Sequence, residues 1–127
     1  MTVQLDHTII PALDKHASAA FLADILGLPA PVPVASFLVV QIDHGVSLDY
    51  ATADRDVRPQ HFAFCVSEPE FDAIFDRVRA RALPYWADPR RTRPGEIDQR
   101  GRGRGFYFED PSGHYLEVLT RPSAERS

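Results

Sequence analysis

The sequence has a single cysteine, no long apolar run and no excess of basic side chains. Cys65 is the only cysteine among 127 residues, which excludes an internal disulfide and fits a reducing cytoplasm. No apolar run reaches the roughly 18 residues of a membrane-spanning helix, and no basic segment precedes an apolar one as in a secretion signal. Fourteen basic and eighteen acidic side chains give a net charge of −4, which disfavours nucleic-acid binding.

The composition otherwise matches that of an ordinary globular protein. Apolar types account for 44% of the residues and charged types for 25%, which excludes a disordered tail or a charge-rich coiled coil. At roughly 100–200 residues per domain, the length predicts a single domain. We therefore expect a cytoplasmic, single-core protein that binds neither nucleic acid nor a membrane.

Two helices carry the clearest local signals. Asp14 is a favourable N-cap and Gly27 a favourable C-terminal stop, which together predict a helix over 15–26. A capping box over 67–70, with proline in the first turn, predicts a second helix over 68–82. Apolar residues recur along this second helix at helical spacing and predict one face that packs on a sheet: Phe71, Ile74, Phe75, Val78 and Ala82.

Strand patterns flank each helix. Alternation predicts strands over 3–10 and 60–66, ahead of the two helices. Hairpins are expected over 37–50 and 106–120, after the helices, with glycine in each turn. The order of strand, helix and two or three further strands therefore occurs twice.

This repetition predicts an internal duplication, with modules over about 1–55 and 58–122. One helix covers only one face of a small sheet, so two such βαβββ modules are expected to pair. Pairing would give an α+β fold with a curved mixed sheet and helices on its convex side. The open concave face is where a site is expected.

Four side chains of metal-ligating types lie opposite the apolar faces of their strands. His7 lies in the first strand of the first module, and His61 holds the same place in the second. Asp49 and Glu117 lie in the last strands of the two modules, between apolar neighbours that point the other way. Each residue alone has an ordinary structural explanation. Together, their equivalent places favour a site for a divalent ion such as Zn²⁺, Ni²⁺, Mn²⁺ or Fe²⁺.

Several segments resemble the vicinal-oxygen-chelate superfamily, which includes glyoxalase I, fosfomycin thiol transferases, extradiol dioxygenases and bleomycin-resistance proteins. They are LDHTII at 5–10, ILGL at 25–28, QHFAF at 60–64 and GRGFYFEDPSGHYLE at 103–117. The resemblance implies paired βαβββ modules, a homodimer and a small-molecule substrate. It also implies the metal ligands His7, Asp49, His61 and Glu117.

Several activities within that superfamily stay open. A glyoxalase-like lyase or isomerase would use all four ligands, although Pro11 stands where glyoxalase I has an arginine and Asp49 where it has a glutamate. Fosfomycin thiol transferases and extradiol dioxygenases share a set to which His7, His61 and Glu117 correspond. The alternative from another class is a metal-free binding protein of the bleomycin-resistance type.

A basic segment over 88–104 contains six arginines and three glycines. Its ordinary explanation is a solvated loop, and the functional one is a lid that holds an anionic substrate. Glu117 or Asp49 is the expected general base beside the metal. The substrate contacts that we predict come from four further residues, Trp86, Arg104, Tyr107 and Tyr115.

Overall fold

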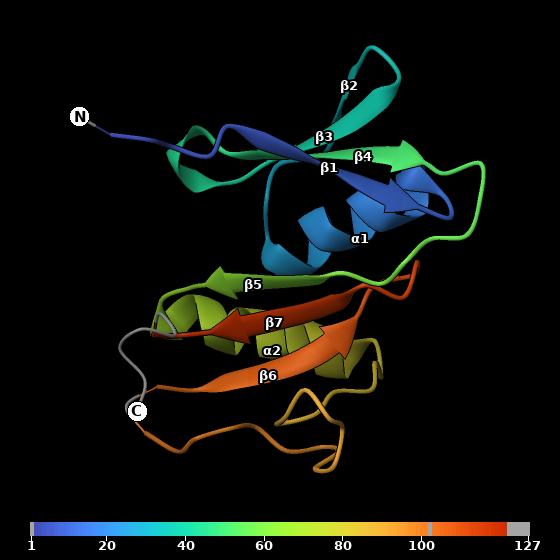
Figure 1. Ribbon diagram of the computed structural model, residues 1–127. Helices are drawn as coiled ribbons and strands as arrows, with labels where there is room; N and C mark the ends of the chain where they lie inside the picture. Colours follow the sequence, from blue (N-terminus) through green and yellow to red (C-terminus); the bar gives the residue numbers. More distant parts are fainter. Residues whose placement is uncertain (1, 102, 122–127) are drawn as a thin grey trace. The chain divides into compact units, whose positions relative to one another are not determined.

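The computed structural model describes residues 2–101 and 103–121 and divides the chain into two units, Met1–Arg58 and Pro59–Ser127. Each unit has a small mixed sheet and one helix (Figure 1). Neither helix in the described residues is long and apolar enough to cross a membrane. Unit 1 comprises β1 (His7–Ala12), α1 (Lys15–Leu26), β2 (Val32–Val34), β3 (Phe37–Gln41) and β4 (Ser47–Thr52); unit 2 comprises β5 (His61–Cys65), α2 (Glu68–Ala80), β6 (Gly105–Glu109) and β7 (Tyr115–Leu119).

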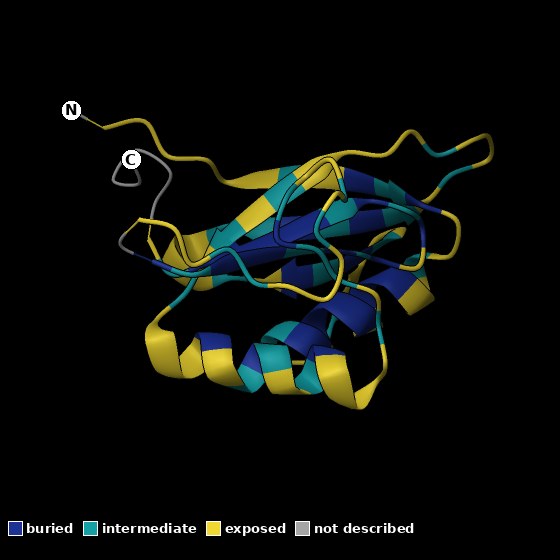
Figure 2. Cartoon of the chain, turned by 90° about the horizontal axis from the view of Figure 1, so that it is seen from below, coloured by how far each residue is buried: buried dark blue, intermediate teal, exposed yellow. Residues whose placement is uncertain are grey.

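Unit 1 has the strand order β1-β4-β3-β2, in which β1 runs parallel to β4 and the other pairs are antiparallel. The helix α1 covers one face of this sheet. Within the unit, helix and strands are buried on the sides where they meet (Figure 2). The core side chains of this layer include Ile10, Leu22, Ile25, Val40, Leu48 and Tyr50. Because side chains alternate along a strand, His7, Ile9 and Asp49 lie on the opposite face.

The helix α1 begins and ends where the sequence predicts. The Asp14 carboxylate accepts hydrogen bonds from the backbone N–H groups of His16 and Ala17. Gly27 takes a left-handed conformation with φ of 72°, which glycine adopts without steric cost. The helix predicted over 15–26 is therefore confirmed.

Unit 2 has the strand order β5-β7-β6, with β5 parallel to β7 and β6 antiparallel to it. Its core is aromatic. The Phe106 ring is fully buried and meets four other rings at centroid distances of 5.4–5.9 Å: Phe71, Phe75, Tyr85 and Phe108. These contacts attach α2 to β6 and thereby fix the strand that carries Tyr107.

The helix α2 has the predicted capping box at Ser67 and Glu70 but ends at Ala80, two residues before the predicted end. Ala82 takes a left-handed conformation with φ of 54°. The N–H groups of Ala82 and Leu83 donate to the carbonyls of Arg79 and Val78, the pattern of a Schellman motif. Ala82 is therefore exposed and does not belong to the packed face, contrary to the prediction.

The first strand also departs from the prediction. It was expected over 3–10, but β1 covers His7–Ala12, and Val3 and Leu5 are exposed at 94% and 62%. The register with β4 explains the difference, because the paired residues begin at His7 with Ser47. The predicted hairpins are confirmed by β3 with β4 and by β6 with β7.

Unit 2 lacks a regular counterpart of β2 among its described residues. Where unit 1 places β2 beside β3, unit 2 joins the segment before β6 to that strand only by isolated bridges, Trp86 with Tyr107 and Asp98 with Gly105. The backbones of Trp86 and Tyr107 exchange hydrogen bonds of 2.9 and 2.8 Å. Pro84, Pro89 and Pro94 interrupt the surrounding segment, and proline cannot donate to a strand ladder. The βαβββ order therefore holds in full for unit 1 and is reduced to βαββ in unit 2.

Candidate functional site

His61 and Glu117 form a direct pair on the face of the unit 2 sheet that α2 leaves uncovered. Glu117 is aligned with Ala63, two residues after His61, so the two side chains meet diagonally across β5 and β7. His61 Nε2 lies 2.9 Å from Glu117 Oε1. A carboxylate only accepts, so the imidazole N–H donates. The Glu117 side chain is 9% exposed and that of His61 is 49% exposed, so the acid is shielded while the imidazole is open to a ligand.

His7 and Asp49 occupy the same register in unit 1. Asp49 is aligned with Ile9, two residues after His7, as Glu117 is aligned with Ala63. The shorter acid does not bond to the histidine; Asp49 Oδ1 accepts from Ser47 Oγ at 2.9 Å. The two imidazole–carboxylate pairs are therefore equivalent in backbone position, and only the pair in unit 2 is in direct contact.

The His7 imidazole is oriented by its neighbour. Its Nδ1 lies 2.7 Å from Asp6 Oδ2, and since the carboxylate only accepts, Nδ1 carries the proton. This hydrogen bond, with a smaller contribution from the charge of Asp49, raises the pKa of His7 above its usual value. Metal-ligating histidines typically donate one ring N–H to a carboxylate and bind the ion through the other nitrogen. Nε2 of His7 is the nitrogen presented for that purpose.

Replacing Asp6 with asparagine is expected to lower the pKa of His7, because the main group that favours the charged imidazole is lost. The His7–Asp6 ion pair is present while His7 is protonated and is lost as the pH rises through this raised pKa. NMR titration of the His7 imidazole protons in the metal-free wild type and in D6N measures the change. An unchanged His7 titration in D6N would contradict the assigned hydrogen bond.

The described residues contain no group of three or more His, Cys, Asp or Glu side chains placed to hold a metal ion. Each unit instead supplies one histidine and one carboxylate, a nitrogen and an oxygen donor of the kinds that zinc and neighbouring divalent ions accept. The donor chemistry of both pairs fits such an ion. A metal centre therefore needs ligands beyond the pair that either unit provides.

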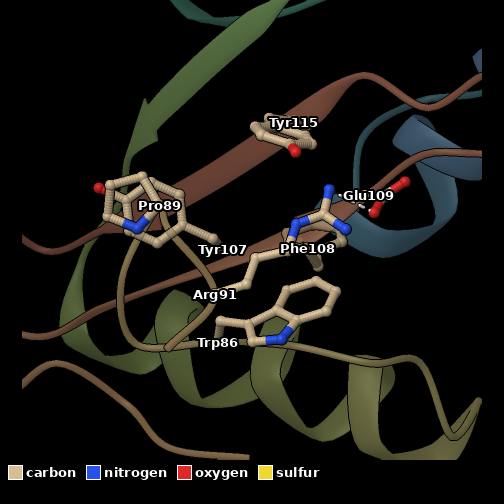
Figure 3. Close-up of a pocket in the computed structure, with 7 residues that line it drawn as sticks. All are labelled: Trp86, Pro89, Arg91, Tyr107, Phe108, Glu109 and Tyr115. Atoms are coloured by element: carbon tan, nitrogen blue, oxygen red, sulfur yellow. Dashed lines mark ion pairs between the residues drawn. The ribbon is translucent and has the colours of Figure 1, made fainter. Parts of the chain in front are cut away.

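Unit 2 has a pocket whose lining residues are drawn in Figure 3. Tyr107 and Tyr115 of this pocket lie on the same face of the sheet as Glu117, because side chains alternate along a strand. The Tyr107 ring lines the pocket and also lies 5.8 Å from the His61 ring, so the pocket borders the pair directly. Trp86, Tyr107 and Tyr115, three of the four predicted substrate contacts, are brought together here. The other lining residues are Pro89, Arg91, Phe108 and Glu109.

Arg104, the fourth predicted substrate contact, lies elsewhere in unit 2. Its guanidinium pairs with Glu68 at 2.8 Å and Asp72 at 2.9 Å, and it stacks 4.3 Å from the Phe71 ring centroid. These partners belong to α2, which covers the other face of the sheet. In the structure Arg104 ties β6 to the helix and is not among the pocket-lining residues.

Sequence reasoning missed two polar residues of the pocket, Arg91 and Glu109. Arg91 Nη2 pairs with Glu109 Oε2 at 2.5 Å, and the guanidinium stacks on two rings of the pocket. The arginine-rich composition of 88–104 pointed to the segment but not to one side chain. Glu109 could have been found from the sequence. It lies two residues after the predicted substrate contact Tyr107, so the two side chains share one face of the strand.

A buried histidine stabilises the start of the strand that carries His61. His114 is fully buried, and its Nδ1 accepts a hydrogen bond of 3.0 Å from the backbone N–H of Gln60. Asp110 Oδ1 accepts from the N–H groups of Ser112 and His114 at 2.9 Å each. This turn therefore fixes the residue that immediately precedes His61.

The comparison with known proteins agrees with this architecture. The sequence pattern of the Glyoxalase/Bleomycin resistance protein/Dioxygenase superfamily matches residues 4–118. The chain belongs to this superfamily, and its two units of mixed sheet and helix are those of the vicinal-oxygen-chelate fold. This confirms the resemblance that the sequence motifs indicate.

The chain is most usefully compared with three individual proteins. The solved structure of Oxidase ChaP-H1 matches with a TM-score of 0.93 at 58% identity, covering 95% of this chain and 98% of that chain. Glutathione transferase FosA of Serratia marcescens is 30% identical over 133 residues, which covers 99% of this chain and 86% of that protein. Metallothiol transferase FosB of Lysinibacillus sphaericus (strain C3-41) is 29% identical, covering 99% of this chain and 89% of that protein.

Proposed function

We propose that this chain is a metal-dependent oxidase of the superfamily that acts on a small, oxygen-rich molecule. The observation that carries the proposal is the 58% identity with Oxidase ChaP-H1 over 95% of the chain. The His61–Glu117 pair, and the pocket that borders it, would form the surface on which the substrate is oxidised. The free thiol of Cys65 supports a reducing, cytoplasmic location.

The proposed metal ligands are His7, Asp49, His61 and Glu117. Two imidazoles and two carboxylates suit Zn²⁺, Ni²⁺, Mn²⁺ or Fe²⁺, and the printed name of the relative FosB is that of a metallothiol transferase. Combining the two pairs requires a unit 1 to assemble with a unit 2, and a homodimer is the proposed assembly. A divalent ion in such a site would supply Lewis-acid stabilisation of negative charge on substrate oxygens.

Glu117 is the proposed general base. Its carboxylate is shielded from solvent, so a proton removed from a substrate can rest on an oxygen that water does not reach freely. Asp49 is the second acid that could take this role. Trp86, Tyr107 and Tyr115 would bind the body of the substrate in the pocket, and Arg104 remains a predicted contact only.

Thiol transfer is the second candidate function. It is favoured by the 30% identity with Glutathione transferase FosA over 99% of this chain. An assay panel separates the two candidates. Oxygen uptake with catechol supports the oxidase, whereas consumption of fosfomycin with glutathione, or of methylglyoxal with glutathione, supports a transferase or a glyoxalase-like enzyme.

The metal site predicts that the purified protein retains a stoichiometric divalent metal after mild dialysis and loses it to EDTA. His61→Ala is expected to lower metal affinity by at least about 100-fold, the upper end of the loss seen when only an outer-shell partner is removed. Elemental analysis and titration calorimetry measure both. His16→Ala, on the exposed side of α1, is the matched control and should bind metal normally.

Metal-free wild-type protein that also fails to bind added Zn²⁺, Ni²⁺, Mn²⁺ or Fe²⁺ would contradict the proposal. That result would favour the metal-free binding protein of the bleomycin-resistance type. Equal metal affinity in His61→Ala and His16→Ala would show that the ion binds somewhere other than the predicted site.

A further inference from the structure

The guanidinium of Arg91 is held between two aromatic rings of the pocket. Its Cζ lies 4.6 Å from the ring centroid of Trp86 and 4.4 Å from that of Tyr115 (Figure 3). A planar guanidinium stacks on aromatic faces and is attracted by their π-electrons. Its orientation is therefore fixed before any ligand arrives, which lowers the entropic cost of binding one.

The backbone around Arg91 presents this side chain to the pocket. Arg91 has a left-handed φ of 61°, an uncommon conformation for a residue other than glycine. The Asp88 carboxylate stabilises the turn by accepting hydrogen bonds from the backbone N–H groups of Thr92 and Arg93, at 3.0 Å each. The Arg91 N–H donates to the Asp88 carbonyl at 3.2 Å. These hydrogen bonds fix the conformation of the turn, and the turn places the Arg91 side chain in the pocket.

The hydrogen-bonding capacity of Arg91 is only partly used. Glu109 pairs with Nη2, and the side chains of Arg91 and Glu109 are 34% and 35% exposed. The Glu109 carboxylate therefore pairs with one of the three guanidinium nitrogens. A guanidinium has five N–H donors in a planar fork, and the fork matches the two oxygens of a carboxylate.

We propose that Arg91 binds a carboxylate of the substrate, at the end remote from the atoms that react beside His61 and Glu117. The proposal rests on the function proposed above for the position of the reacting end. Tyr107 connects the two regions, since its ring lines the pocket and touches His61. A cation is disfavoured because Arg91 is itself positive and lies in an arginine-rich segment. Trp86, Pro89 and Tyr115 add apolar surface for the body of such an acid.

Trp86 provides a direct readout, because it is the only tryptophan in the chain. Its fluorescence is titrated in EDTA-treated protein with three probes of similar shape: benzoate, benzamide and benzylammonium. EDTA prevents the carboxylate from binding a metal ion instead. Benzoate is expected to bind at least about 10-fold more tightly than benzamide, as one charge-assisted hydrogen bond predicts, and benzylammonium is expected not to bind.

Variants assign the effect to one side chain. Arg91→Gln, which removes the charge, is expected to weaken benzoate binding by at least about 10-fold. Arg91→Lys keeps the charge but loses the planar pair of donors, and it should weaken benzoate binding several-fold. If Arg91→Gln does not fold, the affinity of Arg91→Lys for benzoate tests the proposal instead. Arg90→Gln is the matched control, since Arg90 is exposed and does not line the pocket. Glu109→Gln should strengthen benzoate binding, because a competing carboxylate is neutralised.

Three results would overturn the proposal. They are equal benzoate affinity in the wild type and Arg91→Gln, the lack of any saturable benzoate response, and benzylammonium binding to Arg91→Gln that exceeds benzoate binding to the wild type. The last would identify an aromatic cage for cations that Arg91 fills. A protein that retains metal but fails the benzoate test overturns only the carboxylate site, whereas one that binds benzoate through Arg91 without ever binding metal overturns only the proposed oxidase.

Discussion

Glu117→Gln is expected to abolish tight metal binding and nearly all activity while leaving the protein folded. Glutamine keeps the size of the side chain and an oxygen that can accept from His61, but it loses the negative charge and cannot act as a base. A positioned general base contributes about 10²–10⁴-fold, so kcat/KM should fall by about that factor or more once a substrate is known. Metal affinity, measured by calorimetry, should fall by at least about 100-fold.

The thermal stability of the metal-free protein separates this effect from a structural one. Removing a shielded charge relieves its desolvation, so the Tm of metal-free Glu117→Gln should equal or exceed that of the wild type. Glu96→Gln, an exposed change in the segment that follows the pocket turn, is the control and should alter neither metal binding nor activity. Full activity in Glu117→Gln together with lost metal would rule out the proposed mechanism.

Phe106→Ala is expected to cause the largest loss of stability, about 3–5 kcal/mol in the free energy of unfolding. Its fully buried ring contacts Phe71 and Phe75 of α2 and Phe108 of its own strand, so truncation leaves a cavity that rigid aromatic neighbours cannot fill. The free energy of unfolding of a domain this size is typically only about 5–15 kcal/mol, so the substitution removes a large fraction of it. Urea unfolding followed by circular dichroism measures the change.

Phe64→Ala is the comparison for this experiment. Phe64 lies in β5 of the same unit but is only partly buried, so its truncation removes less apolar contact and should cost clearly less. The slope of the unfolding curve should stay the same in both variants, since it reflects the surface exposed on unfolding. An equal loss in the two variants would contradict the assignment of Phe106 to the centre of the unit 2 core.

Local signals in the sequence predicted much of the fold. The N-terminal caps of α1 and α2 are bonds between residues at most three positions apart, so they can be recognised without knowing the tertiary structure. The faces of Asp49 and Glu117 followed from the alternation of side chains along a strand. The three-residue β2 has no such signal, because it is short and contains Pro33.

The features that were not predicted depend on contacts between distant segments. The start of β1 is set by its register with β4, which begins at His7 with Ser47; residues 2–6 lie outside this register despite their alternating pattern, although the Asp6 carbonyl still accepts from the Ser47 N–H at 3.0 Å. The inward direction of Arg91 depends on a left-handed backbone and on the side chain of Asp88, and nothing in a run of arginines distinguishes one from another. Arg104 shares its composition with that run but is drawn to Glu68 and Asp72 of α2.

The single bridge between Trp86 and Tyr107 has an evolutionary consequence. A full strand at this position would be bound to β6 by a ladder of hydrogen bonds. Inserting one residue into such a strand would move each of its side chains to the opposite face of the sheet. Because Trp86 and Asp98 meet β6 only at isolated bridges, the chain between these two bridges can gain or lose residues while β6 and β7 keep their alignment. Descendants of this protein can therefore diversify what they recognise by lengthening or shortening this part of the chain, without disturbing the strand that bears Glu117.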